Sequence, residues 1–254
     1  SSSSTVRFLP PEPTNHSSLT TNHSSSIALL TNGSGAMARL CVDLGTVRSK
    51  YDCLLGANLH AAVPVDRHVF VKRLRAWVNA DGFITALNAE NLVAFTPGPP
   101  AVWQFVANAG DGRSVEIHLL ADMVPGKNTT LLRFVRPPHA PALGHELPSE
   151  CSVSITVRFD IEDRSFHCET KRNPGSEHHL GSNSHSLQGR AGFAFTPASD
   201  RQLKVWADAG RYHHEGEWSV NVPHPVEATR GQEGCGDAFS PGWFELPLRR
   251  GEAV

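Results

Sequence analysis

A glycine-bearing turn near the start of the chain has the composition of a ligand-binding turn. Asn32 is followed by Gly33 and, two positions later, by Gly35. Because glycine adopts backbone conformations closed to other residues, this turn can bring its N–H groups and the Asn32 amide close to a ligand. The sequence therefore predicts a polar contact at Asn32, with an ordinary β-turn as the competing interpretation.

A second cluster follows the turn and combines three kinds of side chain. Lys50, Tyr51 and Asp52 supply a cation, an aromatic face and an acceptor at consecutive positions. A sugar offers hydroxyls to polar groups and C–H faces to a ring, so the combination suits a carbohydrate. We expect Asn32, Lys50, Tyr51 and Asp52 to lie close together on the surface as a substrate-binding site. The competing interpretation makes Tyr51 a core residue and the two charges a surface pair that adds little stability.

The segment Arg211–Trp218 gathers aromatic, acidic and basic residues in one polar stretch, which we expect to be a loop. It contains Tyr212 and Trp218, whose rings can stack on pyranose faces while charged neighbours bond the hydroxyls. We interpret both as further substrate-binding residues. Trp103 and Trp206 lie in apolar strand patterns, and we expect them in the core.

Acid–base chemistry would require paired carboxyl groups, or a histidine beside a carboxylate. Asp160 and Glu162 fall on the polar face of an alternating strand, where charge is expected, so we interpret them as structural. We expect Arg230 to buttress its loop through Glu227, three residues earlier. The pair His178-His179 lacks helical ligand spacing and a flanking cysteine pair, so the sequence predicts no metal site and no cofactor.

The bulk composition excludes several classes of function. The chain has 254 residues, is 39% hydrophobic and 19% charged, and carries a formal net charge of −2, so nothing points to nucleic acid as a partner. No apolar run approaches the roughly 18 residues of a membrane-spanning helix. Five cysteines without a C-x-x-C pair argue against a disulfide framework. The expected compartment is therefore reducing, and the expected localisation cytoplasmic.

Period-two alternation of apolar and polar residues is the dominant structural signal. It is clearest over 153–162, and Asp111-Gly112 between two apolar runs predicts a hairpin. We expect residues 137–150 to form a connecting loop and residues 171–190 a long exposed loop, and no segment shows sustained helical periodicity. The predicted strands lie near 68–78, 90–95, 102–108, 113–121, 129–136, 151–162, 192–196, 201–208 and 242–248.

Many strands separated by turns predict an all-β fold, a two-sheet antiparallel β-sandwich. Residues 27–254 are expected to form this single domain. Residues 1–26 are rich in Ser, Thr, Asn, His and Pro and cannot bury enough apolar surface, so we expect a disordered tail. The first residue is serine, which indicates a segment taken from a longer protein.

Three blocks of the sequence resemble the N-terminal domain of bacterial and archaeal-type glycogen-debranching enzymes, the amylo-α-1,6-glucosidase family. The resemblance covers roughly residues 27–248, and Cys53 departs from it because the family usually has glycine there. The matching blocks are Asn32-Gly33-x-Gly35 with Lys50-Tyr51-Asp52-x-Leu54-Leu55, then Pro64–Leu74, then Glu227-Ala228-Thr229-Arg230-Gly231 with Ser240-Pro241-Gly242-Trp243-Phe244.

The resemblance implies a large sandwich, often called a supersandwich, that recognises an α-glucan. It implies that a C-terminal helical domain of the parent chain carries the catalytic carboxylates that hydrolyse α-1,6 branch points. The present segment would then lack the catalytic residues, and its partners would be an α-glucan and that helical domain.

Two other functions fit the sequence. One is a self-contained aldose mutarotase-like sugar enzyme, which would use His167 or His213 with Glu215 in a deep cleft. The other is a purely structural domain that docks a catalytic domain without touching sugar.

Overall fold

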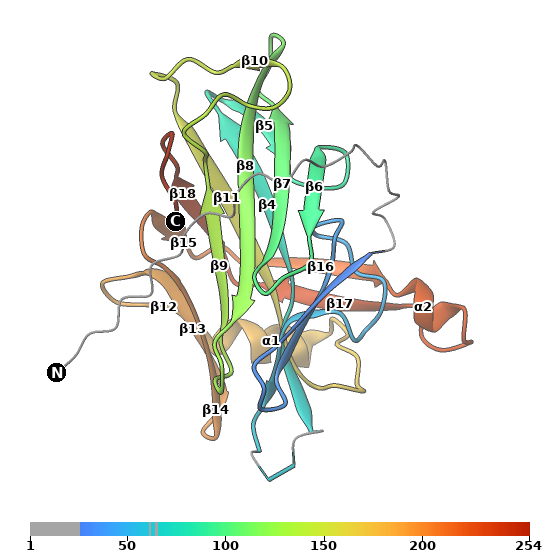
Figure 1. Cartoon of the computed structure of the whole chain (residues 1–254). Helices are drawn as coiled ribbons and strands as arrows, with labels where there is room; N and C mark the ends of the chain where they lie inside the picture. The colour runs from blue at the N-terminus through green and yellow to red at the C-terminus, as the bar shows by residue number, and fades with distance from the viewer. Residues whose placement is uncertain (1–25, 61, 64–65) are drawn as a thin grey trace, which may run out of the picture.

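Long alternating strands build the part of the chain that the computed structural model describes, residues 26–60, 62–63 and 66–254 (Figure 1). The longest pair is β4 (Arg67–Ala80) and β11 (Val153–Ser165), which run antiparallel from the pairing of Ala80 with Val153 to that of His68 with Ser165. Of the predicted tail, only Ser26 lies within the described residues.

The larger sheet has ten strands, and β4 and β11 lie at its centre. Its order runs β1-β2-β3-β4-β11-β17-β16, while β5 pairs with β4, and β18 pairs with both β11 and β15. The remaining strands of this sheet are β1 (Ile27–Thr31), β2 (Met37–Cys41), β3 (Cys53–Asn58), β5 (Phe83–Ala86), β15 (Arg211–His213), β16 (Glu217–Pro223), β17 (Cys235–Ser240) and β18 (Trp243–Pro247).

Two smaller sheets complete the strands. The five-stranded sheet is antiparallel except for β10, which runs parallel to β8, and the third sheet has three antiparallel strands. The five-stranded sheet contains β6 (Leu92–Thr96), β7 (Ala101–Asn108), β8 (Arg113–Met123), β9 (Thr130–Val135) and β10 (His145–Glu146). The three-stranded sheet contains β12 (Ser184–Ser186), β13 (Ala191–Ala198) and β14 (Arg201–Ala207).

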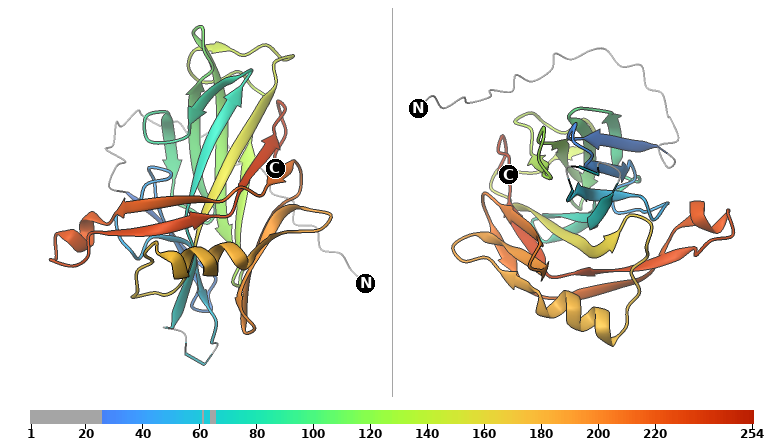
Figure 2. Two further views of the ribbon diagram at one scale, coloured as in Figure 1. Left: turned by 180° about the vertical axis from the view of Figure 1, so that it is seen from behind. Right: turned by 90° about the horizontal axis from the view of Figure 1, so that it is seen from below.

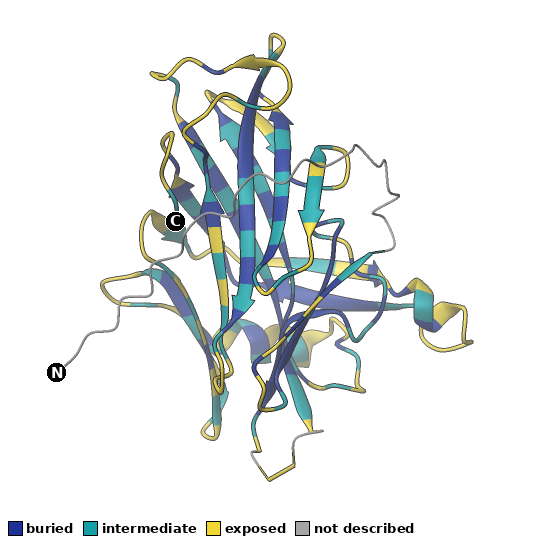
Figure 3. Ribbon diagram, viewed as in Figure 1, coloured by how far each residue is buried: buried dark blue, intermediate teal, exposed yellow. Residues whose placement is uncertain are grey.

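The core lies between the larger sheet and the five-stranded sheet, where Figure 3 shows the strands alternating between buried and partly exposed positions. Trp103 and Ile117 of the five-stranded sheet and Val78, Ile155 and Phe244 of the larger sheet belong to one continuous cluster of buried side chains. The all-β sandwich predicted from the alternation is therefore confirmed, with the three-stranded sheet as an addition.

The β16–β17 hairpin leaves the sandwich as an arm that carries α2 (Pro225–Ala228) at its tip (Figures 1 and 2). The segment between β11 and α1 (Pro174–Ser182) lies beside this arm. The carboxylate of Asp237 in β17 accepts a hydrogen bond from the backbone N–H of Arg172, and the backbone N–H of Asp237 donates to the Thr170 carbonyl. Within the described residues, neither helix is long and apolar enough to cross a bilayer.

Each predicted strand coincides with a strand of the structure, but the expected loop over 171–190 is wrong. The prediction also missed β1–β3, β5, β12 and β15–β17, and the expected connecting loop over 137–150 contains β10. Asp111 and Gly112 both have positive φ, 52° and 71°, in the β7–β8 hairpin. The region 171–190 instead contains α1 and β12. Leu180 is the one buried residue of α1, so no apolar periodicity announces the helix. The remaining signal is local: Asn173 caps the helix, and Pro174 follows it.

Candidate functional site

The Asn32 turn forms as predicted, but the Asn32 side chain points into the protein. Its Oδ1 accepts hydrogen bonds from the backbone N–H groups of Ser34 (2.8 Å) and Ala36 (3.0 Å), and its Nδ2 donates to the Lys127 carbonyl (2.9 Å). Gly33 has the positive φ of 75° that the turn requires. Asn32 is 5% exposed and both ends of its amide are hydrogen-bonded, so it fixes the β1–β2 turn against the loop after β8.

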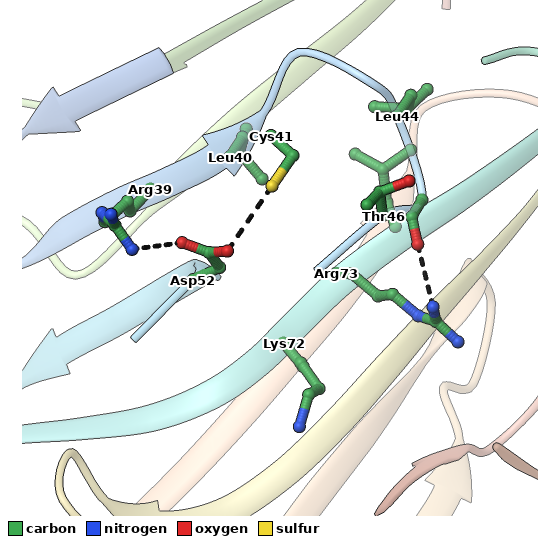
Figure 4. Close-up of a pocket in the computed structure, with 10 residues that line it drawn as sticks. Arg39, Leu40, Cys41, Leu44, Thr46, Asp52, Lys72 and Arg73 are labelled. Carbon is green, nitrogen blue, oxygen red and sulfur yellow. Dashed lines mark hydrogen bonds and ion pairs between the residues drawn. The ribbon is translucent and has the colours of Figure 1, made fainter. Parts of the chain in front are cut away.

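Asp52 is likewise a structural residue. One carboxylate oxygen accepts the N–H groups of Arg48 (2.8 Å) and Ser49 (3.0 Å), and the other pairs with the Arg39 guanidinium. Figure 4 shows this carboxylate directed at Arg39 and Cys41 beside a small hollow between β2 and β4. With 2% of its surface exposed, Asp52 closes the turn before β3 and has no oxygen left for a sugar.

The four residues expected to cluster lie at two ends of one strand. Asn58, at the end of β3, donates to the carbonyl of Ser34 in the Asn32 turn (2.8 Å), whereas Asp52 immediately precedes the start of the strand. Five residue steps of extended strand separate the two ends by about 16 Å. The prediction of a single Asn32–Asp52 cluster is therefore wrong, because β3 lies between its members.

Lys50 and Tyr51 instead meet two aromatic residues that follow β11. The Tyr51 ring lies 4.8 Å from Phe166 and 5.7 Å from His167, measured between ring centroids. The Tyr51 hydroxyl is 3.2 Å from His167 Nδ1, and Lys50 Nζ donates to the His167 carbonyl (3.1 Å). We call Lys50, Tyr51, Phe166 and His167 the Tyr51 cluster. Tyr51 is half-buried, so it is neither a free surface ring nor a core residue.

Glu227 supports the Tyr51 cluster by hydrogen bonds to the segment that carries Lys50 and Tyr51. This buried carboxylate accepts hydrogen bonds from the Ser49 hydroxyl (2.7 Å) and the Lys50 N–H (3.2 Å), and these bonds join α2 to the segment between β2 and β3. Arg230 is exposed; its backbone N–H donates to the Glu227 carbonyl (2.9 Å), but among the described residues no ion pair joins the two side chains. The expected Arg230–Glu227 buttress is therefore limited to this backbone contact, and the Glu227 side chain supports the Lys50 segment instead.

Arg164 joins the two segments that form the Tyr51 cluster. Its guanidinium donates to the carbonyl of Lys50 (2.6 Å) and to the carbonyls of Phe166 (3.2 Å) and Cys168 (3.0 Å). Glu162 accepts from its Nε (2.8 Å) and also pairs with the buried Lys72 (3.2 Å). The polar side of β11 was expected to face solvent, but both Glu162 and Asp160 are fully buried by the cations opposite them.

A second buried pair lies under the same segment. His224 is fully buried, with Nδ1 3.4 Å from a Glu169 oxygen. Burial opposes ionisation of Glu169, but His224, Lys72 and more distant Arg164 hold the pKa of its carboxyl below the usual value. A Cβ on Gly236 would lie 2.8 Å from Glu169 Oε2 and 2.9 Å from His224 Cε1, so a larger residue at this position in β17 would displace the pair.

Tyr212 and Trp218 belong to strands β15 and β16 rather than to a loop. The half-buried Tyr212 ring packs 5.0 Å from Phe244 and 5.5 Å from Phe193, and burial raises the pKa of its hydroxyl. Tyr212 thus packs against the core cluster. Trp218 packs 5.4 Å from Phe239 and lies under the Arg172 guanidinium, 5.8 Å from the ring centroid.

One short segment connects the Tyr51 cluster with Trp218. Phe166 and His167 contact Tyr51 at its beginning, and Arg172 covers Trp218 at its end. Six residue steps span at most about 21 Å, so residues far apart in the sequence lie along one short segment beside the hairpin arm. We call Lys50, Tyr51, Phe166, His167, Arg172 and Trp218 the 166–172 surface.

The sequence singled out Lys50, Tyr51 and Trp218 as sugar contacts but not Phe166 or Arg172. Phe166 is more than a hundred positions from Tyr51, and Arg172 is several dozen positions from Trp218. The one local signal for this site was the basic and aromatic residues at the end of β11, Arg164, Phe166 and His167. Trp103 is buried in the core as predicted, whereas Trp206 is 50% exposed under Arg190, so its core prediction is wrong.

Neither His167 nor His213 pairs with Glu215, so the pair expected for a mutarotase-like enzyme does not form. His213 Nε2 contacts Glu245 (3.2 Å) and its ring stacks on Trp243 at 3.9 Å, while Glu215 accepts from the Trp243 indole (3.1 Å). His167 lies in the Tyr51 cluster. Among the described residues, no group of three or more His, Cys, Asp or Glu side chains could hold a metal ion.

Comparison with protein families assigns the fold to a known lineage. No curated protein matched the chain. A family model described as the N-terminal domain of glycogen debranching enzyme matches residues 28–254, which includes every strand of the sandwich. The chain therefore belongs to the glycogen debranching enzyme N-terminal domain family.

Proposed function

We propose that this domain binds an α-glucan chain at the 166–172 surface and presents it to the catalytic part of a debranching enzyme. The observation that carries the proposal is that one short segment contacts Tyr51 at its beginning and Trp218 at its end. The family to which the chain belongs supports a glucan as the ligand.

The chemistry of the 166–172 surface suits a neutral polyol. Tyr51, Phe166 and Trp218 supply ring faces for the C–H sides of glucose units. Lys50, His167 and Arg172 supply donors for hydroxyls at both ends of the segment. Arg172 is already paired with Glu177 through its Nε (2.5 Å), so the surface attracts no strongly charged ligand at that end.

The reaction proposed for the parent enzyme is hydrolysis of α-1,6 branch points. Its acid and base would come from a helical catalytic domain of the parent chain, because Asp160, Glu162 and Glu227 of this domain are already bonded. The five cysteines are unpaired thiols, which supports a reducing, cytoplasmic setting.

Binding of maltoheptaose, measured by isothermal titration calorimetry, tests the proposal. Tyr51→Ala and Trp218→Ala should each weaken binding about fivefold or more, because a lost aromatic contact is worth about 1 kcal/mol. Trp206→Ala is the matched control, since Trp206 is also half-exposed beneath an arginine but lies on β14. It should leave the affinity unchanged.

The stability of each variant decides between binding and packing. If Tyr51→Ala leaves affinity intact and lowers the free energy of unfolding by about 3–5 kcal/mol, Tyr51 is a packing residue and the glucan site is refuted. The purely structural docking role would then be the better account. Because one domain binds weakly, the same variants should be compared in the full-length enzyme at low substrate concentration.

A further inference from the structure

The guanidinium of Arg164 lies directly beneath the Tyr51 cluster. Its side chain is 3% exposed, so nearly all of its bonding is internal. Its donors reach carbonyls on both sides of the cluster, Lys50 on one side and Phe166 and Cys168 on the other. A single side chain thereby links two segments that are more than a hundred positions apart.

A buried carboxylate opposes the charge of Arg164. Glu162 lies between Lys72 and Arg164 and pairs with both. A buried arginine held this way keeps its planar guanidinium in one orientation, because rotating away would leave a buried carboxylate without this partner. The carbonyls of the two segments are therefore held at fixed positions before any ligand arrives.

We propose that Arg164 is a positioning residue that sets the Tyr51 ring against Phe166 and His167 in the unliganded protein. The consequence for glucan affinity rests on the function proposed above, whereas the position of the ring does not. A pre-positioned surface binds without the entropic cost of ordering its loops. Arg164 itself touches no ligand, because its donors face the backbone from inside.

Lysine cannot replace Arg164 in this role. An ammonium group keeps the charge opposite Glu162 but cannot reach carbonyls on both segments at once. Arg164→Lys should thus preserve the ion pair and release the Lys50 segment from the segment after β11. Arg201→Lys is the matched control, because Arg201 makes a two-point contact with Asp163 away from this surface.

The chain has two tyrosines, so NMR of ring-labelled tyrosine reports on Tyr51 and Tyr212 separately. Tyr51→Phe identifies the Tyr51 signal. In Arg164→Lys, the Tyr51 signal should shift and broaden while that of Tyr212 stays in place, and maltoheptaose affinity should fall about tenfold. Arg201→Lys should leave the Tyr51 signal and the affinity as in the wild type.

The two readouts separate failure of this inference from failure of the proposed function. If the wild-type domain binds no glucan, the proposed function fails, yet the Tyr51 signal still tests Arg164. An unchanged Tyr51 signal in folded Arg164→Lys would overturn the positioning role. Should that variant not fold, the side-chain ¹⁵N signals of Arg164 in the wild type decide: slow guanidinium rotation supports the inference, and free rotation refutes it.

Discussion

At the scale of single residues, Asp163 binds together three elements of the fold. His68 of β4 lies 2.6 Å from one carboxylate oxygen and His179 of α1 lies 2.9 Å from the other. Arg201 of β14 donates to both oxygens. Burial opposes ionisation of Asp163, but these three partners outweigh it and hold the pKa of the carboxyl well below the ordinary 3.8.

This depressed pKa predicts a loss of stability in acid. A carboxyl whose pKa is lower in the folded than in the unfolded state stabilises the fold fully above the unfolded value, near pH 4, and progressively less as pH falls below it. Asp163→Asn should lower the free energy of unfolding by about 3 kcal/mol at pH 7, because it removes the buried charge that Arg201 and the two histidines share. Urea unfolding at pH 7 and at pH 3 should show this difference shrinking in acid. A difference that is equal at both pH values would contradict the assignment.

At the scale of elements, α1 depends on its first turn. Asn173 Oδ1 accepts the Ser176 N–H (3.0 Å), and the Ser176 hydroxyl accepts the Asn173 N–H (2.9 Å), so the two residues form a capping box. Leu180 alone is buried, and packing therefore supports this helix weakly. The capping box therefore contributes an unusually large part of the stability of α1.

Asn173→Ala should therefore lower the free energy of unfolding by about 1 kcal/mol. Asn173→Ser, which restores a capping oxygen, should recover most of the loss. Thermal unfolding followed by circular dichroism gives both values. Equal stability of the alanine and serine variants would show that the cap is dispensable.

Local signals predicted most of the longer strands, because strand periodicity and glycine turns depend on neighbouring residues. The β11 alternation and the Asp111-Gly112 hairpin are examples. The site was less predictable, since its contacts join distant positions. Asn32 turned inward because Lys127 lies opposite it, and Glu162 is buried because Lys72 and Arg164 neutralise it. Contacts between residues far apart in the sequence cannot be predicted from a short window of neighbouring residues.

At the scale of the whole molecule, three fully buried carboxylates are each engaged by partners within the sandwich. Asp160 pairs with Arg73 and Arg75, Glu162 lies between two cations, and Glu227 supports the Lys50 segment. None of these three is free to transfer a proton to a glycosidic oxygen. The domain is expected to contribute binding surface to a reaction performed elsewhere in the parent enzyme.

The isolated domain should consequently release no glucose from a branched limit dextrin above a buffer blank. A coupled glucose assay over several hours gives the measurement, with the full-length enzyme as the positive control. Steady release by the domain that Glu215→Gln abolishes would overturn this expectation and revive a self-contained enzyme.

The cysteines differ in accessibility in a way that makes the 166–172 surface easy to label. Burial raises the pKa of the Cys41 and Cys53 thiols to about 12, which keeps them protonated and inert toward maleimides. Cys168, in contrast, is exposed between His167 and Glu169. With Cys151 and Cys235 changed to serine, a fluorescent dye on Cys168 would sit one residue from the Tyr51 cluster. The fold thus provides its own attachment point for a reporter of glucan arrival.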